Sequence, residues 1–374
     1  MSGLARWLAE QRAARVSGGL ERRLVVREET MIDLAGNDYL GLATDPGVIE
    51  GAIRAAREYG VGAGASRLVT GNLAIHEQLQ AELAEFTKRP AALAFSTGYH
   101  ANLGAVTALA DADTLIVSDA HVHASLVDAC RLARGRVEIV GHNDVDAVRA
   151  ALAHRSEPRA LVVVESIYSV LGDAAPLAEL AALCATHDAT LLVDEAHAIG
   201  VAGEGGRGLA YDIDLAEPER LVVTATMSKA LGAQGGVVLA DSAVIEHLVN
   251  TARAFIFDTG LAPPAAGAAR AALETLADRP ELVTRVRSHA AALAEACVVE
   301  PPAGAVLSVP ITSPEAAVRA RDKLAWEGLR VGCFRPPSVP DRVSRLRITA
   351  RAALADSDVE HACRILPTIV SEGA

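Results

Sequence analysis

The stretch Thr226–Gly232, which reads Thr-Met-Ser-Lys-Ala-Leu-Gly, directly follows an apolar run over residues 221–225. The apolar run predicts a buried strand, and the glycines after Lys229 predict a loop, so the lysine amine is expected at the end of a strand. A lone lysine in such a loop is usually a solvated surface charge. A lysine placed there can also be a covalent catalyst, and the rest of the chain has to decide between the two.

Two more stretches have the same arrangement of an apolar run followed by polar residues. One is Val193–His197, in which Asp194 and His197 end a predicted strand. The other is Ala91–Phe95, which passes through the hydroxyl-rich turn of residues 96–102 into a helical pattern, where backbone N–H groups attract anions. Pyridoxal 5'-phosphate (PLP) needs a lysine for its aldehyde, an acid for its ring nitrogen and a cradle for its phosphate. The three stretches together therefore predict a PLP site.

Strand-length apolar runs alternate with helical patterns between residue 72 and about residue 255. We expect strands at 91–95, 114–117, 136–140, 160–165, 190–194, 221–225 and 236–240, and helices that include 123–133, 145–154 and 176–187. This alternation predicts an α/β fold with a mainly parallel seven-stranded sheet covered by helices on both faces. Ligands bind beyond the carboxyl ends of such strands. The residues expected at that edge are Ser96, His123, Ser169, Asp194, His197 and Lys229.

The chain is predicted to divide into an N-terminal arm (1–45), a large domain (46–258) and a small α+β C-terminal domain (259–374). The arm is expected to contain an amphipathic helix near 4–16 and a strand beginning at Ile32, and a long helical stretch is expected at 242–257. Further strands are expected near 305–311, 329–333 and 344–349, with helices near 314–327 and at the C-terminus. The glycine-rich segment 60–67 is expected to be a loop, because no strand precedes it as a dinucleotide-binding fingerprint requires.

Composition narrows the class of protein. With 374 residues and 51% hydrophobic residues, the chain can bury a large core. A formal net charge of −12 argues against a general nucleic-acid binder. The five cysteines are widely spaced without a C-x-x-C pair, which indicates neither a disulfide framework nor a metal site. No signal-peptide core or membrane-length apolar run is seen, so we expect a cytoplasmic protein with no membrane or nucleic-acid partner.

The ordered motifs resemble the α-oxoamine synthase family, which belongs to the fold-type I PLP-dependent enzymes, over essentially the whole chain. The matching segments are Asn37–Leu42, Ser66–Gly71, His123–Leu126, Asp194–His197, Thr226–Lys229, Phe255–Leu261 and Arg335–Pro337. The resemblance implies a PLP-dependent acyltransferase that works as a homodimer with its active site at the subunit interface. It is strongest to biotin-pathway members, which condense L-alanine with pimeloyl-CoA or a pimeloyl-acyl carrier protein and release carbon dioxide.

The same resemblance implies catalytic roles for the residues around the ring. Lys229 would form the covalent bond to PLP, and Asp194 would pair with the pyridine nitrogen and keep it protonated. His197 and Ser169 would bond the phenolic oxygen of the ring. His123 would stack on the ring and assist acylation and decarboxylation.

Other matching positions are implied to bind the phosphate or the substrate. The phosphate would be surrounded by Gly98, Tyr99, Thr226 and Ser228. Thr259 would reach the phosphate bound by the partner subunit. The substrate would be contacted by Arg22, Asn37 and Arg347, with Arg347 gripping its carboxylate through a fork that matches a carboxylate.

Departures from the family pattern leave the acyl-chain specificity open. They are Glu21, Leu171, Ala198 and Ser338. A sister enzyme that joins glycine to a short acyl-CoA, such as 2-amino-3-ketobutyrate CoA ligase (glycine C-acetyltransferase), is the nearest alternative. A PLP aminotransferase would also use Asp194 and Lys229, but it would form pyridoxamine phosphate and need no thioester.

Overall fold

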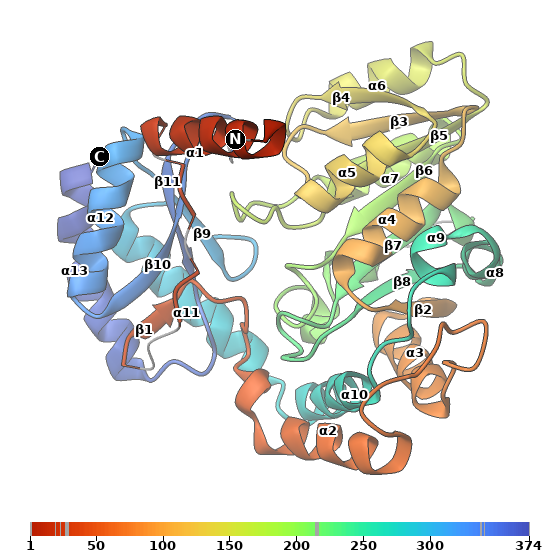
Figure 1. Ribbon diagram of the computed structural model, residues 1–374, viewed down its shortest axis with the longest axis horizontal. Helices are drawn as coiled ribbons and strands as arrows, with labels where there is room; N and C mark the ends of the chain where they lie inside the picture. The colour runs from red at the N-terminus through yellow and green to blue at the C-terminus, as the bar shows by residue number, and fades with distance from the viewer. Residues whose placement is uncertain are drawn as a thin grey trace.

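The larger layer of the computed structural model is a seven-stranded sheet with the strand order β2-β8-β7-β6-β5-β3-β4 (Figure 1). The strands are β2 (Ala91–Phe95), β3 (Thr114–Asp119), β4 (Arg136–Val140), β5 (Arg159–Glu165), β6 (Thr190–Asp194), β7 (Leu221–Thr226) and β8 (Gly236–Ala240). Strands β3 to β7 pair in parallel, whereas β8 runs antiparallel to both β2 and β7. The prediction of a mainly parallel seven-stranded sheet is confirmed. The structure describes residues 2–18, 20–22, 24–26, 30–213, 217–336, 339 and 341–373.

Both faces of this sheet are covered, which explains the unbroken apolar runs. The covering helices are α3 (Ala74–Thr87), α4 (Gly98–Leu109), α5 (Ala124–Leu132), α6 (Val145–His154), α7 (Leu177–Thr186), α8 (Ser242–Thr251) and α9 (Arg253–Ile256). Along β5 the side chains alternate between two cores: Val162 and Val164 belong to one, and Leu161 and Val163 to the other. Because both cores need apolar side chains, the strand shows no polar alternation.

A second, four-stranded sheet combines the N-terminal arm with the C-terminal part of the chain. Its order is β1 (Ile32–Leu34), β10 (Leu329–Phe334), β11 (Arg345–Thr349) and β9 (Val306–Pro310), with β1 parallel to β10. The helices α11 (Glu281–Cys297), α12 (Pro314–Trp326) and α13 (Asp356–Gly373) accompany this sheet (Figure 1). The division at residues 45 and 258 stays a prediction, and β1 crosses it by pairing with the C-terminal sheet.

Helices α2 (Pro46–Tyr59) and α10 (Pro263–Asp278) lie side by side at one end of the molecule (Figure 1). Their backbones approach closely, since a Cβ added at Gly51 would stand 2.7 Å from the carbonyl oxygen of Gly267. Short 3-10 turns complete the fold: η1 (Leu42–Thr44), η2 (Glu204–Gly206), η3 (Leu209–Asp212) and η4 (Pro218–Arg220).

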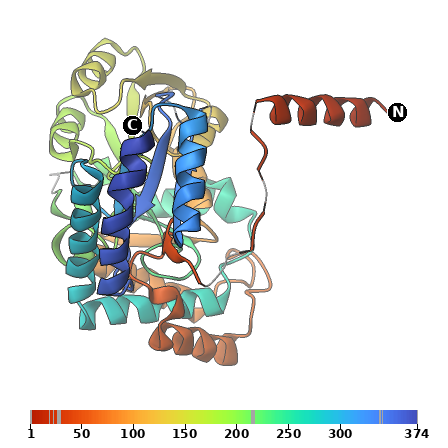
Figure 2. The same cartoon turned by 90° about the vertical axis from the view of Figure 1, so that its left-hand side faces the viewer.

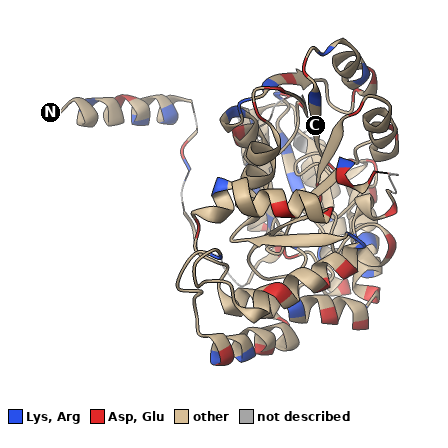
Figure 3. Ribbon diagram, turned by 90° about the vertical axis from the view of Figure 1, so that its right-hand side faces the viewer, with Lys and Arg blue, Asp and Glu red and all other residues tan. Residues whose placement is uncertain are grey.

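Helix α1 (Gly3–Ser17) confirms that the N-terminal segment is helical, and it stands away from the two sheets (Figure 2). The prediction that it is amphipathic is wrong, because its apolar side chains do not gather on one face. None of its residues is buried. The prediction of one long helix over 242–257 is wrong, because Ala252 adopts an extended backbone (φ −71°, ψ 100°) that separates α8 from α9. Acidic and basic residues are interspersed along the ribbon in Figure 3. Within the described ranges, every helix is too short or too polar to span a bilayer.

Candidate active site

A cavity of about 260 Å³ opens at the carboxyl ends of β6 and β7. The predicted residues that line it are Gly98, Tyr99, His123, Asp194, His197, Thr226, Ser228 and Lys229. They come from four separate segments of the chain, and the parallel sheet brings those segments to one edge. The structure therefore assembles the predicted lysine, acid and cradle around one space.

Lys229 follows β7 on a loop that approaches the N-terminal region closely at Gly232. Gly232 has a φ of +60°, and a Cβ there would stand 2.3 Å from the backbone nitrogen of Ala43. The Nζ atom of Lys229 lies 2.7 Å from Nε2 of His197. Burial lowers the pKa of Lys229 from 10.5 to about 8, with the positive charge of Arg347 adding to the effect. An appreciable fraction of the amine is therefore neutral near physiological pH, as a nucleophile or base requires.

His197 is the neutral partner of that amine. Burial, followed by the charges of Lys229 and Arg347, lowers the pKa of His197 well below its usual value. A neutral imidazole nitrogen can accept a hydrogen bond from Lys229, whereas an imidazolium could not. On its other side, Nδ1 of His197 lies 2.7 Å from the hydroxyl of Tyr39. Burial raises the pKa of Tyr39 to about 12, so this hydroxyl stays protonated.

Asp194 presents a buried carboxylate whose hydrogen-bond donors are both uncharged. Its Oδ1 accepts from the backbone N–H of Ala196 at 2.9 Å, and its Oδ2 accepts from Nδ2 of Asn102 at 2.7 Å. A buried carboxylate is costly unless a positive charge or several donors compensate it. The protonated pyridine nitrogen of PLP is a cation of the required kind, so the acid fits the cofactor.

The start of α4 forms a cradle that fits a phosphate. Thr97 caps the helix by accepting from the backbone N–H of His100 at 3.1 Å. A Cβ at Gly98 would stand 3.0 Å from Cβ of Thr226, so any larger residue would force Thr226 to shift. The hydroxyl oxygens of Thr226 and Ser228 lie 2.5 Å apart beside the helix start. Helix N–H groups and hydroxyls together are the usual donors to a phosphate.

Arg347, on β11, extends from the small sheet to the loops of the large one. Its Nε donates to the carbonyl oxygen of Ser169 at 2.7 Å, and its Nη2 donates to Oδ1 of Asn37 at 3.2 Å. The hydroxyl of Tyr39 donates to the same Asn37 oxygen at 3.1 Å. These contacts connect the predicted substrate arginine with His197 through Asn37 and Tyr39.

Five predicted site residues do not line this cavity, namely Asn37, Arg347, Ser169, Thr259 and Arg22. Ser169 contributes only backbone contacts, since its carbonyl accepts from Arg347 and its N–H donates to Glu165 at 3.0 Å. Thr259 and Arg22 are exposed and do not line the cavity. Their predicted roles toward the ring, a partner subunit and the substrate stay predictions.

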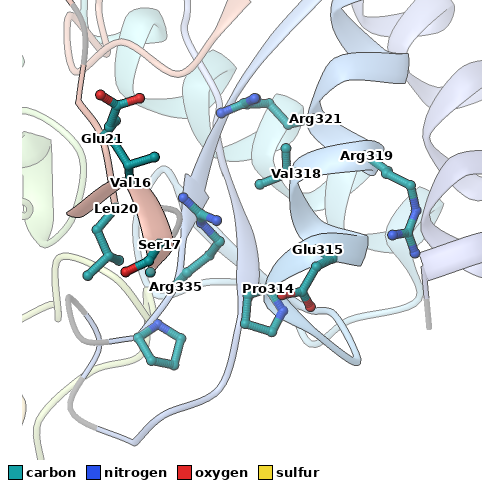
Figure 4. A pocket seen from close by; sticks show the side chains of 12 residues that line it. Val16, Ser17, Leu20, Glu21, Pro314, Glu315, Val318, Arg319, Arg321 and Arg335 are labelled. Carbon is teal, nitrogen blue, oxygen red and sulfur yellow. The ribbon is translucent and has the colours of Figure 1, made fainter. Parts of the chain in front are cut away.

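Three departures from the family pattern, Glu21, Leu171 and Ala198, are among the described residues, and none of the three lines the cavity. Glu21 lines a different, open hollow of about 770 Å³ between the end of α1 and the region of α12 and Arg335 (Figure 4). Ala198 is buried, and Leu171 packs against the main core. Ser338 lies outside the described residues, as does Pro337 of the predicted Arg335–Pro337 motif.

The predicted site residues did not include four polar residues that line the cavity, namely Thr97, Asn102, Ser125 and Glu165. Glu165 ends β5 as Asp194 ends β6, so the same signal of a carboxylate after an apolar run could have found it. Burial and the neighbouring Asp194 raise the pKa of Glu165 to about 8. Asn102 stands four residues after Gly98 and so shares its face of α4.

The family model for class I and II aminotransferases matches residues 29–366. Over 368 residues, the chain is 54% identical to the 8-amino-7-oxononanoate synthase of Mycobacterium sp. (strain JLS), covering 98% of this chain and 96% of the relative. The chain belongs to the 8-amino-7-oxononanoate synthase family. The synthase of Mycolicibacterium smegmatis is 53% identical over the same shares of the two chains. The predicted resemblance is confirmed.

Solved structures agree with this 8-amino-7-oxononanoate synthase assignment. A serine palmitoyltransferase from S. paucimobilis with bound PLP–myriocin aldimine superposes with a TM-score of 0.91 at 28% identity, covering 100% of this chain and 99% of that one. The 8-amino-7-oxononanoate synthase from Francisella tularensis gives 0.79 at 25% identity, covering 92% and 99%. The fold is that of the fold-type I PLP-dependent transferases.

Proposed function

We propose that the chain is a PLP-dependent acyltransferase of biotin biosynthesis, which condenses L-alanine with a pimeloyl thioester. The products are 8-amino-7-oxononanoate, carbon dioxide and the free thiol of CoA or of an acyl carrier protein. The observation that carries the proposal is the Lys229 amine, 2.7 Å from neutral His197, in the cavity that also holds the Asp194 carboxylate. Relatives that are 52–54% identical to this chain are named 8-amino-7-oxononanoate synthase, and this name does not favour the alternative of a glycine C-acetyltransferase.

The surroundings of Asp194 and Lys229 suit the roles that we propose for them toward PLP and the substrate. Bound PLP serves as an electron sink for the charge that develops on the amino acid. Asp194 would hold the pyridine nitrogen protonated, because a carboxylate favours a neighbouring positive charge. Lys229 would bind the cofactor covalently and, once released, would take the α proton of alanine. Its lowered pKa suits it to that exchange.

The substrate carboxylate would be held beside the cavity by Arg347 and Asn37, which are connected to His197 through Tyr39. Arg347 keeps Nε on the carbonyl of Ser169 and Nη2 on Asn37, so its guanidinium is fixed in orientation before the substrate arrives. A fixed fork loses little freedom when a carboxylate binds. L-Alanine therefore fits this end, and the phosphate of PLP fits the cradle at α4.

A second copy of this chain is the proposed partner. Val61, Val69 and Phe257 are 71–81% exposed, and a backbone hydrogen bond joins the two loops that carry them. The loop after Phe257 is also hydrogen-bonded to Ser96, beside the phosphate cradle. A homodimer covering these apolar side chains would bring Thr259 to the partner's cavity. In that case Phe257→Glu should shift the light-scattering mass of the protein from a dimer to a monomer.

A reducing, cytoplasmic location belongs to the same proposal. The five cysteines are all unpaired, and three of them are buried. Secreted proteins generally pair their cysteines, whereas the cytoplasm keeps thiols reduced.

The test is product analysis with purified, PLP-loaded protein. One reaction contains L-alanine with pimeloyl-CoA, a second contains L-alanine with pimeloyl-acyl carrier protein, and a third contains glycine with acetyl-CoA. Mass spectrometry should detect 8-amino-7-oxononanoate in either or both of the first two reactions. The Lys229→Ala variant should produce none.

Each other outcome points to a different enzyme. Turnover of glycine with acetyl-CoA alone would identify a glycine C-acetyltransferase and refute the proposed substrate. Conversion of alanine to pyruvate, with pyridoxamine phosphate formed and no thioester consumed, would identify an aminotransferase.

A further inference from the structure

A continuous chain of hydrogen bonds connects Asp194 on β6 with His123 at the start of α5. Nδ2 of Asn102 lies 2.7 Å from Oδ2 of Asp194 and 2.8 Å from Oγ of Ser125, and Oγ of Ser125 lies 2.8 Å from Nδ1 of His123. Asp194, Asn102 and Ser125 are 4%, 3% and 1% exposed, so solvent cannot easily replace these bonds. His123 itself is open to the cavity.

The carboxylate of Asp194 fixes the direction of the two hydrogen bonds that Asn102 donates. A carboxylate can only accept, so Asn102 must turn its amide N–H₂ toward Asp194, and its second N–H then donates to Ser125. Because Oγ of Ser125 accepts from Asn102, its single proton is free to donate to Nδ1 of His123. Nδ1 is thereby an acceptor.

The backbone supports the same assignment independently. The N–H of Ser125 also donates to Nδ1 of His123, at 3.2 Å, as part of the N-terminal cap of α5. A backbone amide N–H can only donate, so a proton on Nδ1 would face this N–H whatever the orientation of the Ser125 hydroxyl. In the neutral ring the proton must then be on Nε2. Nε2 has no hydrogen-bond partner among the described residues and is left to the cavity.

We propose that Asn102 and Ser125 are positioning residues that carry the orientation of the Asp194 carboxylate to His123 and fix its imidazole as the Nε2–H tautomer. His123 then offers the cavity a hydrogen-bond donor for a carbonyl or carboxylate oxygen of the substrate, and it does not offer a base. Partial burial of the ring, together with the charge of Lys229, lowers the pKa of His123 and so favours this neutral form. The role toward substrate rests on the proposed function, whereas the tautomer is a property of the protein alone.

The direct test is nitrogen-15 NMR of the full-length protein with labelled histidine, recorded with and without PLP. Comparison with a His123→Gln sample assigns the His123 signals. The wild-type spectrum should show Nε2 protonated and Nδ1 as an unprotonated acceptor. In Asn102→Asp, the new carboxyl group would share a proton with Asp194 and would accept a hydrogen bond from the Ser125 hydroxyl. The Ser125 hydroxyl would turn away from His123, so Nδ1 should gain proton character and the ring should titrate at a higher pH.

Ser125→Ala provides a second variant, because it removes the hydroxyl and keeps the backbone N–H. It should weaken the Nε2–H preference and lower kcat on the order of 10-fold, because one of the two hydrogen bonds to Nδ1 is lost, with a smaller change in KM. Ser118→Ala is the matched control. Ser118 is equally a buried serine, and its hydroxyl donates to the carbonyl of Asp119 at 3.2 Å, outside this chain of bonds.

An Nδ1–H tautomer in the wild type would overturn the proposal. So would His123 signals that are the same in Asn102→Asp, Ser125→Ala and the wild type while circular dichroism shows all three folded. A purely structural role would lower the unfolding midpoint of the variants and leave the tautomer unchanged. Because the NMR measurement needs no substrate, it can succeed even if the product analysis refutes the proposed function.

Discussion

Replacing Lys229 by methionine is predicted to stabilise the PLP-free protein at neutral pH. The reason is that the folded protein holds the ammonium group in surroundings that disfavour its charge, and burial is the largest cause of its lowered pKa. Methionine has a similar length and no charge to desolvate. Residues that serve chemistry commonly lower stability in this way.

The size of the effect follows from the two pKa values of Lys229. The pKa is 10.5 for the free side chain and about 8 in the folded protein. At about 1.4 kcal/mol for each pKa unit, the gap corresponds to about 3 kcal/mol. Lys229 is only partly buried, and solvent screening reduces the figure, so we expect about 1–3 kcal/mol. This net value already contains the opposing attraction of Asp194 and Glu165.

The sign depends on pH in a way that identifies the cause. Between pH 8 and pH 10.5 the unfolded chain keeps the proton on Lys229 while the folded chain loses it. The unfolded state then binds more protons, so the stability of the wild type rises with pH across this window. The advantage of Lys229→Met is therefore largest at pH 7 and should fall to about a quarter of that value by pH 10.

Urea unfolding followed by far-ultraviolet circular dichroism, at pH 7 and pH 10, measures the difference. The matched control is Lys323→Met, the same replacement at an exposed position of α12, which should change stability by less than about 0.5 kcal/mol. A variant at position 229 that is equally stable or less stable than the wild type at pH 7 would refute the reasoning. A benefit that persists unchanged at pH 10 would show that packing, and not charge, was the cause.

Further predictions concern single residues of the cavity. Asp194→Asn should lower kcat on the order of 100-fold, since the positive pyridine nitrogen loses its carboxylate, and steady-state kinetics measures it. Arg347→Lys should raise KM for L-alanine about 10-fold with less change in kcat, because a single ammonium replaces the fork. Gly98→Ala should weaken PLP binding in equilibrium dialysis, because the added Cβ would come within 3.0 Å of Thr226. Between pH 4.5 and pH 8 the folded protein keeps the proton on Glu165 and the unfolded chain loses it, so the stability of the wild type falls as the pH rises. Glu165→Gln should remove this fall, and urea midpoints across that range test it.

Each of these has an outcome that would contradict it. An Asp194→Asn enzyme with wild-type turnover would remove the carboxylate from the mechanism. If Arg347→Lys changed kcat and left KM alone, Arg347 would not be the group that holds the ground-state carboxylate. Unchanged PLP affinity in Gly98→Ala would show that the cradle has room to spare, and identical pH profiles for Glu165→Gln and the wild type would show that Glu165 is ionised throughout.

The sheet could be predicted because its signal is local. Strands such as 190–194 and 221–226 are short apolar runs that end in polar residues, and this pattern needs no knowledge of distant segments. The break at Ala252 was missed because no local pattern marks it. Residues 242–257 have a helical pattern on both sides, and only the tertiary structure shows that Ala252 turns the chain between α8 and α9.

The candidate site likewise contains residues that local sequence predicts and residues that only the tertiary structure reveals. Lys229, Asp194 and the cradle at Gly98 each end a predicted strand or begin a predicted helix, so their shared location follows from parallel topology. Asn102 and Ser125 were not recognised, although both stand in quoted motifs. Asn102 contacts Asp194, which is 92 positions away in the chain, and Ser125, which is 23 positions away, and no local pattern reveals these contacts.

The sequence by itself determined the class of the fold, the identity of the lysine and its acid, and the family, because these depend on residue types at short spacings. Only the tertiary structure decided that β1 pairs with β10 and that Arg347 reaches Asn37, 310 residues away in the chain. It alone decided that Asp194 is connected to His123 through Asn102 and Ser125. Hydrogen-bond direction and the pKa values of buried groups depend on distances of about 3 Å between distant segments, and packing, not local sequence, sets those distances.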